Sequence, residues 1–204
     1  MQIVDIYSVF SDSCHECSSC IYAVCKPEYS LDQQKLMIRG FVITYAFLKF
    51  YTGWEHFLEQ SFIAYSLGEE SQNGNKPTRF IFPTDEDHAE RIIRGFAMYP
   101  DWTKTEDVLT LACNLFENGE PFNSELRNIA SSLKEAKTIR NTIGHNSQKS
   151  REAFNSLVRN KYSASMVGIS VSDFLIAQKN PREEPYFKKY FLLMQNAANN
   201  IINY

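Results

Sequence analysis

The sequence predicts an all-α protein, an up-and-down helical bundle with extra helices and a loop-rich middle segment. Three observations lead to this prediction. Apolar residues recur at intervals of three and four along most of the chain, which is the period of an amphipathic helix. Residues that cap helices precede these stretches, and Gly or Pro follows them. The aromatic content of 14% and the apolar content of 44% suffice for a packed core and exclude a disordered chain.

The first helix is predicted over about 2–26, where Pro27 ends it. Its apolar residues lie at helical spacing and should form one buried stripe. The stripe consists of Ile3, Ile6, Phe10, Cys14, Cys17, Ile21 and Val24.

The second helix is predicted over about 32–67, with Ser30 or Asp32 as its N-cap and Gly68 as its stop. It is rich in aromatic residues. We expect Trp54 and the tyrosines at 45, 51 and 65 to pack in the core and at interfaces rather than to form a surface on which nucleic-acid bases stack.

Further helices are expected where capping residues precede periodic stretches, at about 84–95, 105–118, 124–143, 151–161 and 183–202. The composition of Ser71–Thr78 is typical of a loop. Residues 79–83 are either a short strand or part of that loop, and 167–171 either a short strand or a turn. Residues 173–177 are ambiguous.

The N-terminal segment contains Asp5 and no Lys or Arg, so we expect no signal peptide. The longest stretches without charged residues are shorter than the roughly 18 apolar residues of a membrane span. We therefore expect a cytoplasmic protein with no membrane partner.

Four of the five cysteines lie close together, with the spacing C-x2-C-x2-C-x4-C from Cys14 to Cys25. An odd number of cysteines in a cytosolic protein argues against a disulfide framework. A zinc site usually needs a second ligand pair from another element, and the sequence offers none. We expect Cys14 and Cys17 to be core residues and predict no metal, while a metal-binding regulatory protein remains a competing hypothesis.

The segment Ala136–Ser147, AKTIRNTIGHNS, contains the candidate catalytic residues. On a regular helix Arg140 and His145 would be about 140° apart. They share one site only if the helix ends between them, and Gly144 offers that break. Asn141 would then lie beside them. No phosphate-binding glycine loop, nucleophile elbow or H-E-x-x-H zinc motif occurs elsewhere.

The stretch R-N-T-I-G-H resembles the R-x4–6-H signature of the HEPN superfamily (higher eukaryotes and prokaryotes nucleotide-binding). The upstream helix 41–68, with its embedded Trp54-Glu55, is similar to the aromatic helix of many prokaryotic members. The likeness covers about 32–161. It implies a single HEPN-like domain over 1–204, made of an N-terminal helix (1–30), a core that carries the motif (31–161) and a C-terminal helical extension (162–204).

The resemblance further implies a metal-independent endoribonuclease without a cofactor, often a toxin or defence effector, that acts as a homodimer whose two motifs face one another. An antitoxin or another regulatory protein would restrain it. The alternative is an inactive HEPN bundle that binds nucleotide, RNA or a partner protein.

The side chains of the motif suit RNA cleavage, because RNA supplies its own nucleophile, the 2′-OH. His145 can exchange a proton near neutral pH, and Arg140 can hold the phosphate oxygens as charge builds. Asn141 can donate to the phosphate or hold Arg140, and Glu55 can orient Arg140. One histidine does not easily serve as base and acid in one step, so a second copy would complete the site.

The net charge of −3 excludes a uniformly basic protein, but the charge is uneven. Between residues 134 and 161 there are seven Lys and Arg against two Glu. We expect Lys137, Lys149 and Arg151 to bind RNA, and this binding to be sensitive to salt.

Overall fold

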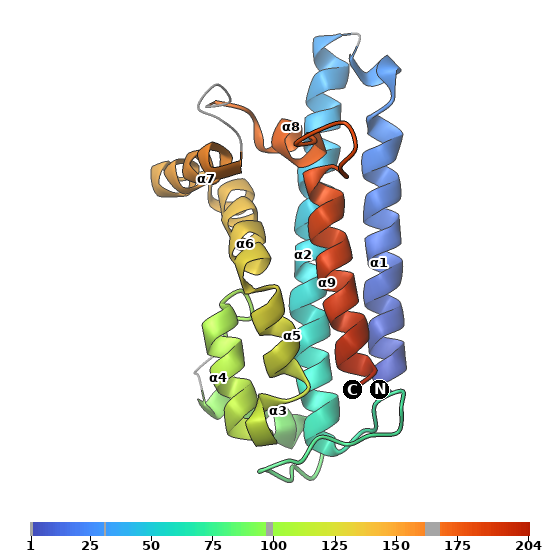
Figure 1. Ribbon diagram of the computed structural model, residues 1–204, viewed down its shortest axis with the longest axis vertical. Coiled ribbons are helices and arrows are strands. Elements are labelled where there is room, and N and C mark those ends of the chain that lie inside the picture. Colours follow the sequence, from blue (N-terminus) through green and yellow to red (C-terminus); the bar gives the residue numbers. More distant parts are fainter. Residues whose placement is uncertain (1, 31, 97–99, 162–167) are drawn as a thin grey trace. The chain divides into compact units, whose positions relative to one another are not determined.

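The computed structural model describes residues 2–30, 32–96, 100–161 and 168–204. Regular secondary structure in these residues is helical, as the sequence predicted, apart from an isolated β-bridge between Arg79 and Phe116. The α-helices, labelled in Figure 1, are α1 (Ile3–Val24), α2 (Gln33–Leu67), α3 (Glu86–Phe96), α4 (Thr105–Leu115), α5 (Phe122–Asn128), α6 (Ala130–His145), α7 (Gln148–Lys161), α8 (Val171–Ile176) and α9 (Tyr186–Ile202). Short 3-10 helices cover Pro27–Ser30 and Glu117–Gly119.

The apolar stripe of α1 is confirmed, because all seven of its residues are buried. The predicted bounds of α2 are also correct within one residue. This helix ends at Gly68, whose φ of 93° is a conformation that favours glycine. Of the aromatic residues named on α2, Trp54 and the tyrosines at 51 and 65 are buried, whereas Tyr45 is exposed.

Two helix predictions are wrong. The helix predicted over 124–143 is two helices, because Ile129 has non-helical backbone angles and separates α5 from α6. Leu126, Ile129 and Leu133 stay buried on both sides of this break, so the apolar period does not reveal it. The helix predicted over 105–118 ends at Leu115, and Asn118 within the following 3-10 turn has a φ of 56°.

The ambiguous segments are also assigned. Residues 79–83 are loop, apart from the isolated bridge at Arg79. Val171 and the residues up to Ile176 form α8. Residue 167 of the segment predicted as strand or turn lies outside the described residues. No helix of the described ranges is long and apolar enough to cross a membrane.

The chain divides into two compact units, and each draws on distant parts of the sequence. Unit 1 consists of 1–11, 53–134 and 193–204, and unit 2 consists of 12–52 and 135–192. These units do not follow the three consecutive parts that the resemblance implies. The interpretation of residues 1–204 as a single domain stays a prediction.

Unit 1 is built around aromatic residues of α2 and α5 and around Phe116, which directly follows α4. The rings of Phe62 and Phe122 stack with their centroids 3.8 Å apart, and Phe116 packs against both. The hydroxyl of Tyr65 donates to the carbonyl oxygen of Ile201 at 2.7 Å. This bond ties the C-terminal part of α9 to α2, and Figure 1 shows the two helices side by side there.

In unit 2 the second half of α1, the first half of α2 and the start of α9 pack side by side (Figure 1). Phe50 of α2 stacks on Phe191 of α9 with centroids 3.7 Å apart, and Tyr22 of α1 meets the edge of Phe187 at 5.4 Å. Stacked and edge-on aromatic pairs of this kind stabilise a core beyond the area that they bury. This packing provides the frame on which α6, α7 and α8 are placed.

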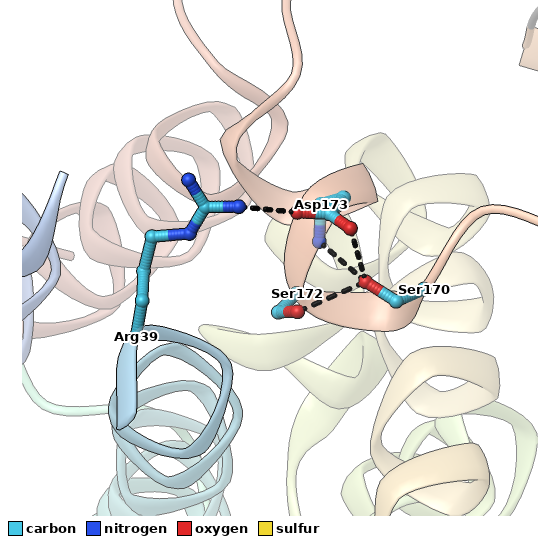
Figure 2. A network of polar contacts seen from close by, with 4 residues as sticks. All are labelled: Arg39, Ser170, Ser172 and Asp173. Atoms are coloured by element: carbon cyan, nitrogen blue, oxygen red, sulfur yellow. Dashed lines mark hydrogen bonds and ion pairs between the residues drawn. The ribbon is translucent and has the colours of Figure 1, made fainter. Parts of the chain in front are cut away.

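Helix α8 is joined to α2 by the polar network in Figure 2. The guanidinium of Arg39 donates to the carboxylate of Asp173 at 2.9 Å. The hydroxyl of Ser170 accepts from the backbone N–H of Asp173 and donates to its carboxylate, which caps the start of α8. Ser172 reaches Gly40 so closely that a Cβ there would lie 3.3 Å from its hydroxyl oxygen.

Candidate functional site

The residues singled out by the motif lie in the last turns of α6, within unit 2. Arg140 and Asn141 are half-buried, whereas His145 is the last residue of the helix and is exposed. The guanidinium of Arg140 donates to the side-chain oxygen of Asn141 at 3.4 Å, which is a long hydrogen bond. Arg140 and Asn141 are therefore brought together, as one of the two roles predicted for Asn141 requires.

The corner between α6 and α7 is held by its own polar groups. Asn146 has a φ of 43°, a left-handed conformation that ends helices, and its N–H donates to Thr142. Ser147 caps α7 by accepting from the N–H of Ser150 at 3.2 Å. The buried hydroxyl of Thr142 lies 3.0 Å from the carbonyl oxygen of Ser150. This corner positions the exposed His145 at a defined place on the surface.

The prediction that the helix ends between Arg140 and His145 is wrong. Helix α6 continues through Gly144 and ends at His145, because it is Asn146, not Gly144, that adopts the left-handed conformation. On a regular helix the two residues therefore point in directions about 140° apart. The backbone of a single chain does not aim them at one point.

Glu55, predicted to orient Arg140, is half-buried on α2. It belongs to unit 1, and Arg140 belongs to unit 2. The pairing of the two residues stays a prediction.

The three residues predicted to bind RNA lie on both sides of this corner. Lys137 is half-buried one helical turn before Asn141, and Lys149 and Arg151 are exposed in the first turn of α7. Positive side chains at a helix N-terminus oppose the helix dipole, at a cost of about 0.3–1 kcal/mol each. An anion bound there would offset this cost.

Not all of the local positive charge is available to a ligand. Lys161 forms an ion pair with Glu135 at 2.7 Å, and the hydroxyl of Tyr190 also donates to Glu135. This ion pair offsets one positive charge at the end of α7, whereas Lys149 and Arg151 at the α6–α7 corner are exposed.

Of the cysteines that the sequence brings together, Cys14, Cys17 and Cys20 lie on α1, and Cys25 directly follows it. Cys14 and Cys17 are buried, as predicted, while Cys20 and Cys25 are exposed. Burial raises the pKa of both the Cys14 and the Cys17 thiols. Over the described ranges, no three His, Cys, Asp or Glu side chains gather in a geometry that holds a metal ion.

Sequence reasoning missed an apolar groove between α1 and α2. It has a volume of about 320 Å³ and is bordered by Phe41, Tyr45 and the Lys49–Glu16 ion pair. The spacing of Phe41 and Tyr45 by four residues is a signal for a shared helix face. That signal was hidden because α2 carries apolar residues on nearly all sides.

Comparisons with known proteins do not place the chain: it matches no protein-family model, and no curated protein or solved structure is significantly similar to it.

Proposed function

We propose that this protein is a metal-independent endoribonuclease of the HEPN type, a toxin or defence effector that works in the cytoplasm as a homodimer. The observation that carries the proposal is the end of α6. There the R-N-T-I-G-H stretch places Arg140 and Asn141 in contact and presents His145 to solvent, next to the basic first turn of α7. These are the groups that phosphodiester cleavage by an internal nucleophile needs.

In the proposed reaction His145 removes the proton from the 2′-OH of the RNA. The resulting oxygen nucleophile attacks the adjacent phosphorus, and the bond from phosphorus to the 5′-oxygen of the next nucleotide breaks. The products are a 2′,3′-cyclic phosphate and a 5′-hydroxyl, so water is not consumed. Arg140 stabilises the charge on the phosphate oxygens through charge-assisted hydrogen bonds, and Asn141 holds its guanidinium.

The leaving 5′-oxygen needs a proton at the same time. His145 of a second copy is the proposed donor, which is the reason for a dimeric site. Because Arg140 and His145 point about 140° apart around α6, the backbone of one chain does not aim both at one phosphate, and the proposed site needs side chains of both copies. An antitoxin or regulatory protein is the expected means of restraining the enzyme.

The same geometry favours a second candidate, an inactive HEPN bundle that binds nucleotide, RNA or a partner protein. Because α6 does not end between Arg140 and His145, a single chain lacks a convergent pair. In this candidate Arg140, Lys149 and Arg151 bind phosphate, and His145 has no role in proton transfer.

RNA cleavage by purified protein tests the proposal. Wild type is incubated with labelled RNA in the presence of EDTA, beside Arg140→Ala, His145→Ala and His145→Gln. We expect cleavage by wild type, cyclic phosphate ends by mass spectrometry, and losses of about 10²–10⁴-fold in the His145 variants, as for a general acid–base group. The matched controls are His56→Ala and Arg127→Ala, which change an exposed His on α2 and an exposed Arg on α5.

The result that contradicts the proposal is equal cleavage by wild type and the Arg140 and His145 variants, or no cleavage of any RNA offered. RNA binding without cleavage, unchanged in His145→Gln, would establish the inactive bundle instead.

A further inference from the structure

The groove between α1 and α2 has the composition of a site for a small molecule. Such sites are typically clefts of about 300–1,000 Å³ with apolar and aromatic walls and few polar groups. The volume of this groove, about 320 Å³, lies within that range. Its apolar walls are formed by Cys17, Cys20, Phe41, Val42, Tyr45 and Ala46. All of them belong to unit 2, and none belongs to the motif on α6.

The charged groups of the groove lie at one end. Glu16 is the first lining residue of α1, and Lys49, the last lining residue of α2, donates to its carboxylate at 2.7 Å. The hydrogen bond to Glu16 raises the pKa of the exposed Lys49 ammonium, so both charges are present at neutral pH. Because the two charges cancel, this end offers no net charge to an ionic head group. A lysine ammonium has three N–H groups, so Lys49 can donate to a neutral acceptor while it holds Glu16.

The dimensions of the groove favour an extended alkyl chain. Between Phe41 and Lys49 its α2 wall rises by about 12 Å, which is the length of an extended chain of about ten carbon atoms. The volume agrees with this length, because an apolar cavity of about 150 Å³ holds one benzene ring, and the groove has about twice that volume. A nucleotide would instead need positive charge and several hydrogen-bonding groups along the walls. The walls are apolar away from the Lys49–Glu16 end, so a nucleotide does not fit.

We propose that the α1–α2 groove binds an unbranched alkyl chain of about ten carbon atoms with an uncharged head group that accepts a hydrogen bond, such as the hydroxyl of a fatty alcohol. The head group accepts from Lys49, and the chain extends past Ala46 toward Phe41. Phe41 and Tyr45 are 75% and 63% exposed, and they lose exposed apolar surface when the chain lies against them. The inference goes beyond the proposed function, and it depends on neither RNA nor catalysis.

Cys20 reports occupancy of the groove, because its exposed thiol lines the groove, whereas the exposed thiols of Cys25 and Cys113 do not. Wild type is treated briefly with N-ethylmaleimide in the presence of straight-chain hexanol, octanol, decanol or dodecanol. Peptide mass spectrometry then measures the modification of each cysteine. We expect the alcohols to protect Cys20 and to leave Cys25 and Cys113 reactive.

The dependence on chain length and head group tests the assigned ligand. The alcohol concentration that protects half of Cys20 should fall about 4-fold for each added methylene group up to about ten carbon atoms, and then level off because a longer chain leaves the groove. Decanoate and decylamine, which carry a charge at neutral pH, should bind about 10-fold more weakly than decanol. Lys49→Met leaves Glu16 as the only charged lining residue, so this variant should bind decylamine more tightly and decanol more weakly than wild type.

Two substitutions alter the walls of the groove. Phe41→Ala removes an exposed wall and should raise the half-protecting concentration of decanol about 10-fold, with a circular dichroism spectrum like that of wild type. Ala46→Leu fills part of the groove, so the affinity should level off at a shorter chain. The matched control is Phe82→Ala, which alters a 72% exposed Phe of unit 1 and should leave decanol binding unchanged.

The inference is overturned if no alcohol protects Cys20, or if Cys25 and Cys113 are protected to the same extent. An affinity that keeps rising through dodecanol without levelling off would overturn it too, and so would decanol binding that Phe41→Ala leaves unchanged. None of these measurements involves RNA, so failure here is distinct from failure of the ribonuclease proposal.

Discussion

At the scale of single residues, Glu135 shows how one carboxylate joins three helices of unit 2. It lies on α6, accepts a hydrogen bond from Tyr190 of α9 at 3.0 Å and pairs with Lys161 of α7 at 2.7 Å. Burial, with the neighbouring Glu135 carboxylate as a second cause, raises the pKa of the Tyr190 hydroxyl above its ordinary value. The hydroxyl therefore stays protonated in the folded protein at pH values where it ionises in the unfolded chain.

This pKa shift predicts how stability changes at alkaline pH. The contribution of Tyr190 is fully present below about pH 10, the ordinary pKa of tyrosine, and is lost as the pH rises further. The unfolded chain then releases the proton first, so the free energy of unfolding falls by up to about 1.4 kcal/mol per pH unit. Tyr190→Phe should lower stability at pH 7 by about 1.5–3 kcal/mol, because a hydrogen bond to a charged acceptor is removed. Above pH 10, the free energy of unfolding of this variant should fall less steeply with pH than that of wild type.

Urea unfolding at pH 7, 9, 10 and 11 measures both effects. Tyr7→Phe, at a half-exposed position of α1, is the matched control and should follow the wild-type curve. If the free energy of unfolding of Tyr190→Phe fell as steeply as that of wild type above pH 10, the Tyr190 hydroxyl would not be the cause of the alkaline loss of stability.

At the scale of elements, the ends of the helices depend on a few residues with special backbone conformations. Gly68 ends α2 with a φ of 93°, and an added Cβ would lie 2.9 Å from the guanidinium of Arg79. That guanidinium donates to the carbonyl oxygen of Ser66 at 2.7 Å. The side chain of Arg79 thus occupies the space that only a glycine leaves open, next to an otherwise unsatisfied carbonyl of the last turn.

Gly68→Ala should therefore lower the free energy of unfolding by more than backbone strain alone would. An alanine with positive φ costs about 1–2 kcal/mol, and displacing Arg79 from the carbonyl of Ser66 should add about 1 kcal/mol. Gly74→Ala is the matched variant, because Gly74 also has a positive φ of 79° but no atoms within 4 Å of an added Cβ. Thermal and urea unfolding of both variants isolate the effect of Arg79. Equal destabilisation by the two substitutions would show that Arg79 moves aside without cost.

Most elements could be predicted from the sequence because their signals are local. The stripe of α1 and the bounds of α2 follow from the apolar period and from Gly68. The break at Ile129 could not be predicted, because the apolar residues keep helical spacing through it. For the same reason, the residues of the candidate site were found but the end of α6 was misplaced: Gly144 is helical, and Asn146 takes the left-handed conformation instead.

At the scale of the whole molecule, the net charge of −3 conceals an uneven distribution. The structure pairs Lys161 with Glu135, whereas Lys149 and Arg151 are exposed near His145. A ligand rich in phosphate would therefore meet positive charge at the α6–α7 corner, although the protein as a whole is acidic.

RNA binding at this corner should be strongly salt-dependent. Removing one positive side chain that binds a phosphate of single-stranded RNA should reduce the slope of log K against log salt concentration by about 0.7. In a His145→Ala background, which prevents the proposed cleavage, Lys149→Ala and Arg151→Ala should each show this reduction. Fluorescence anisotropy with labelled RNA measures the slopes. Lys76→Ala, at an exposed ion pair with Glu70 in unit 1, is the control and should keep the parent slope. Unchanged slopes in both the Lys149 and the Arg151 variants would show that RNA binds elsewhere on the protein.

The sequence by itself determined the helical class, the buried stripe of α1 and the residues of the candidate motif, because helical period and capping act between residues a few positions apart. Only the tertiary structure decided that Arg39 meets Asp173, that Glu135 joins Tyr190 to Lys161, and that Phe41 and Tyr45 stay exposed. The two residues of the Arg39–Asp173 bond are 134 positions apart. A local pattern predicts that a helix forms and which of its faces are apolar, but it carries no information about which distant segment covers that face and which part is left for a partner.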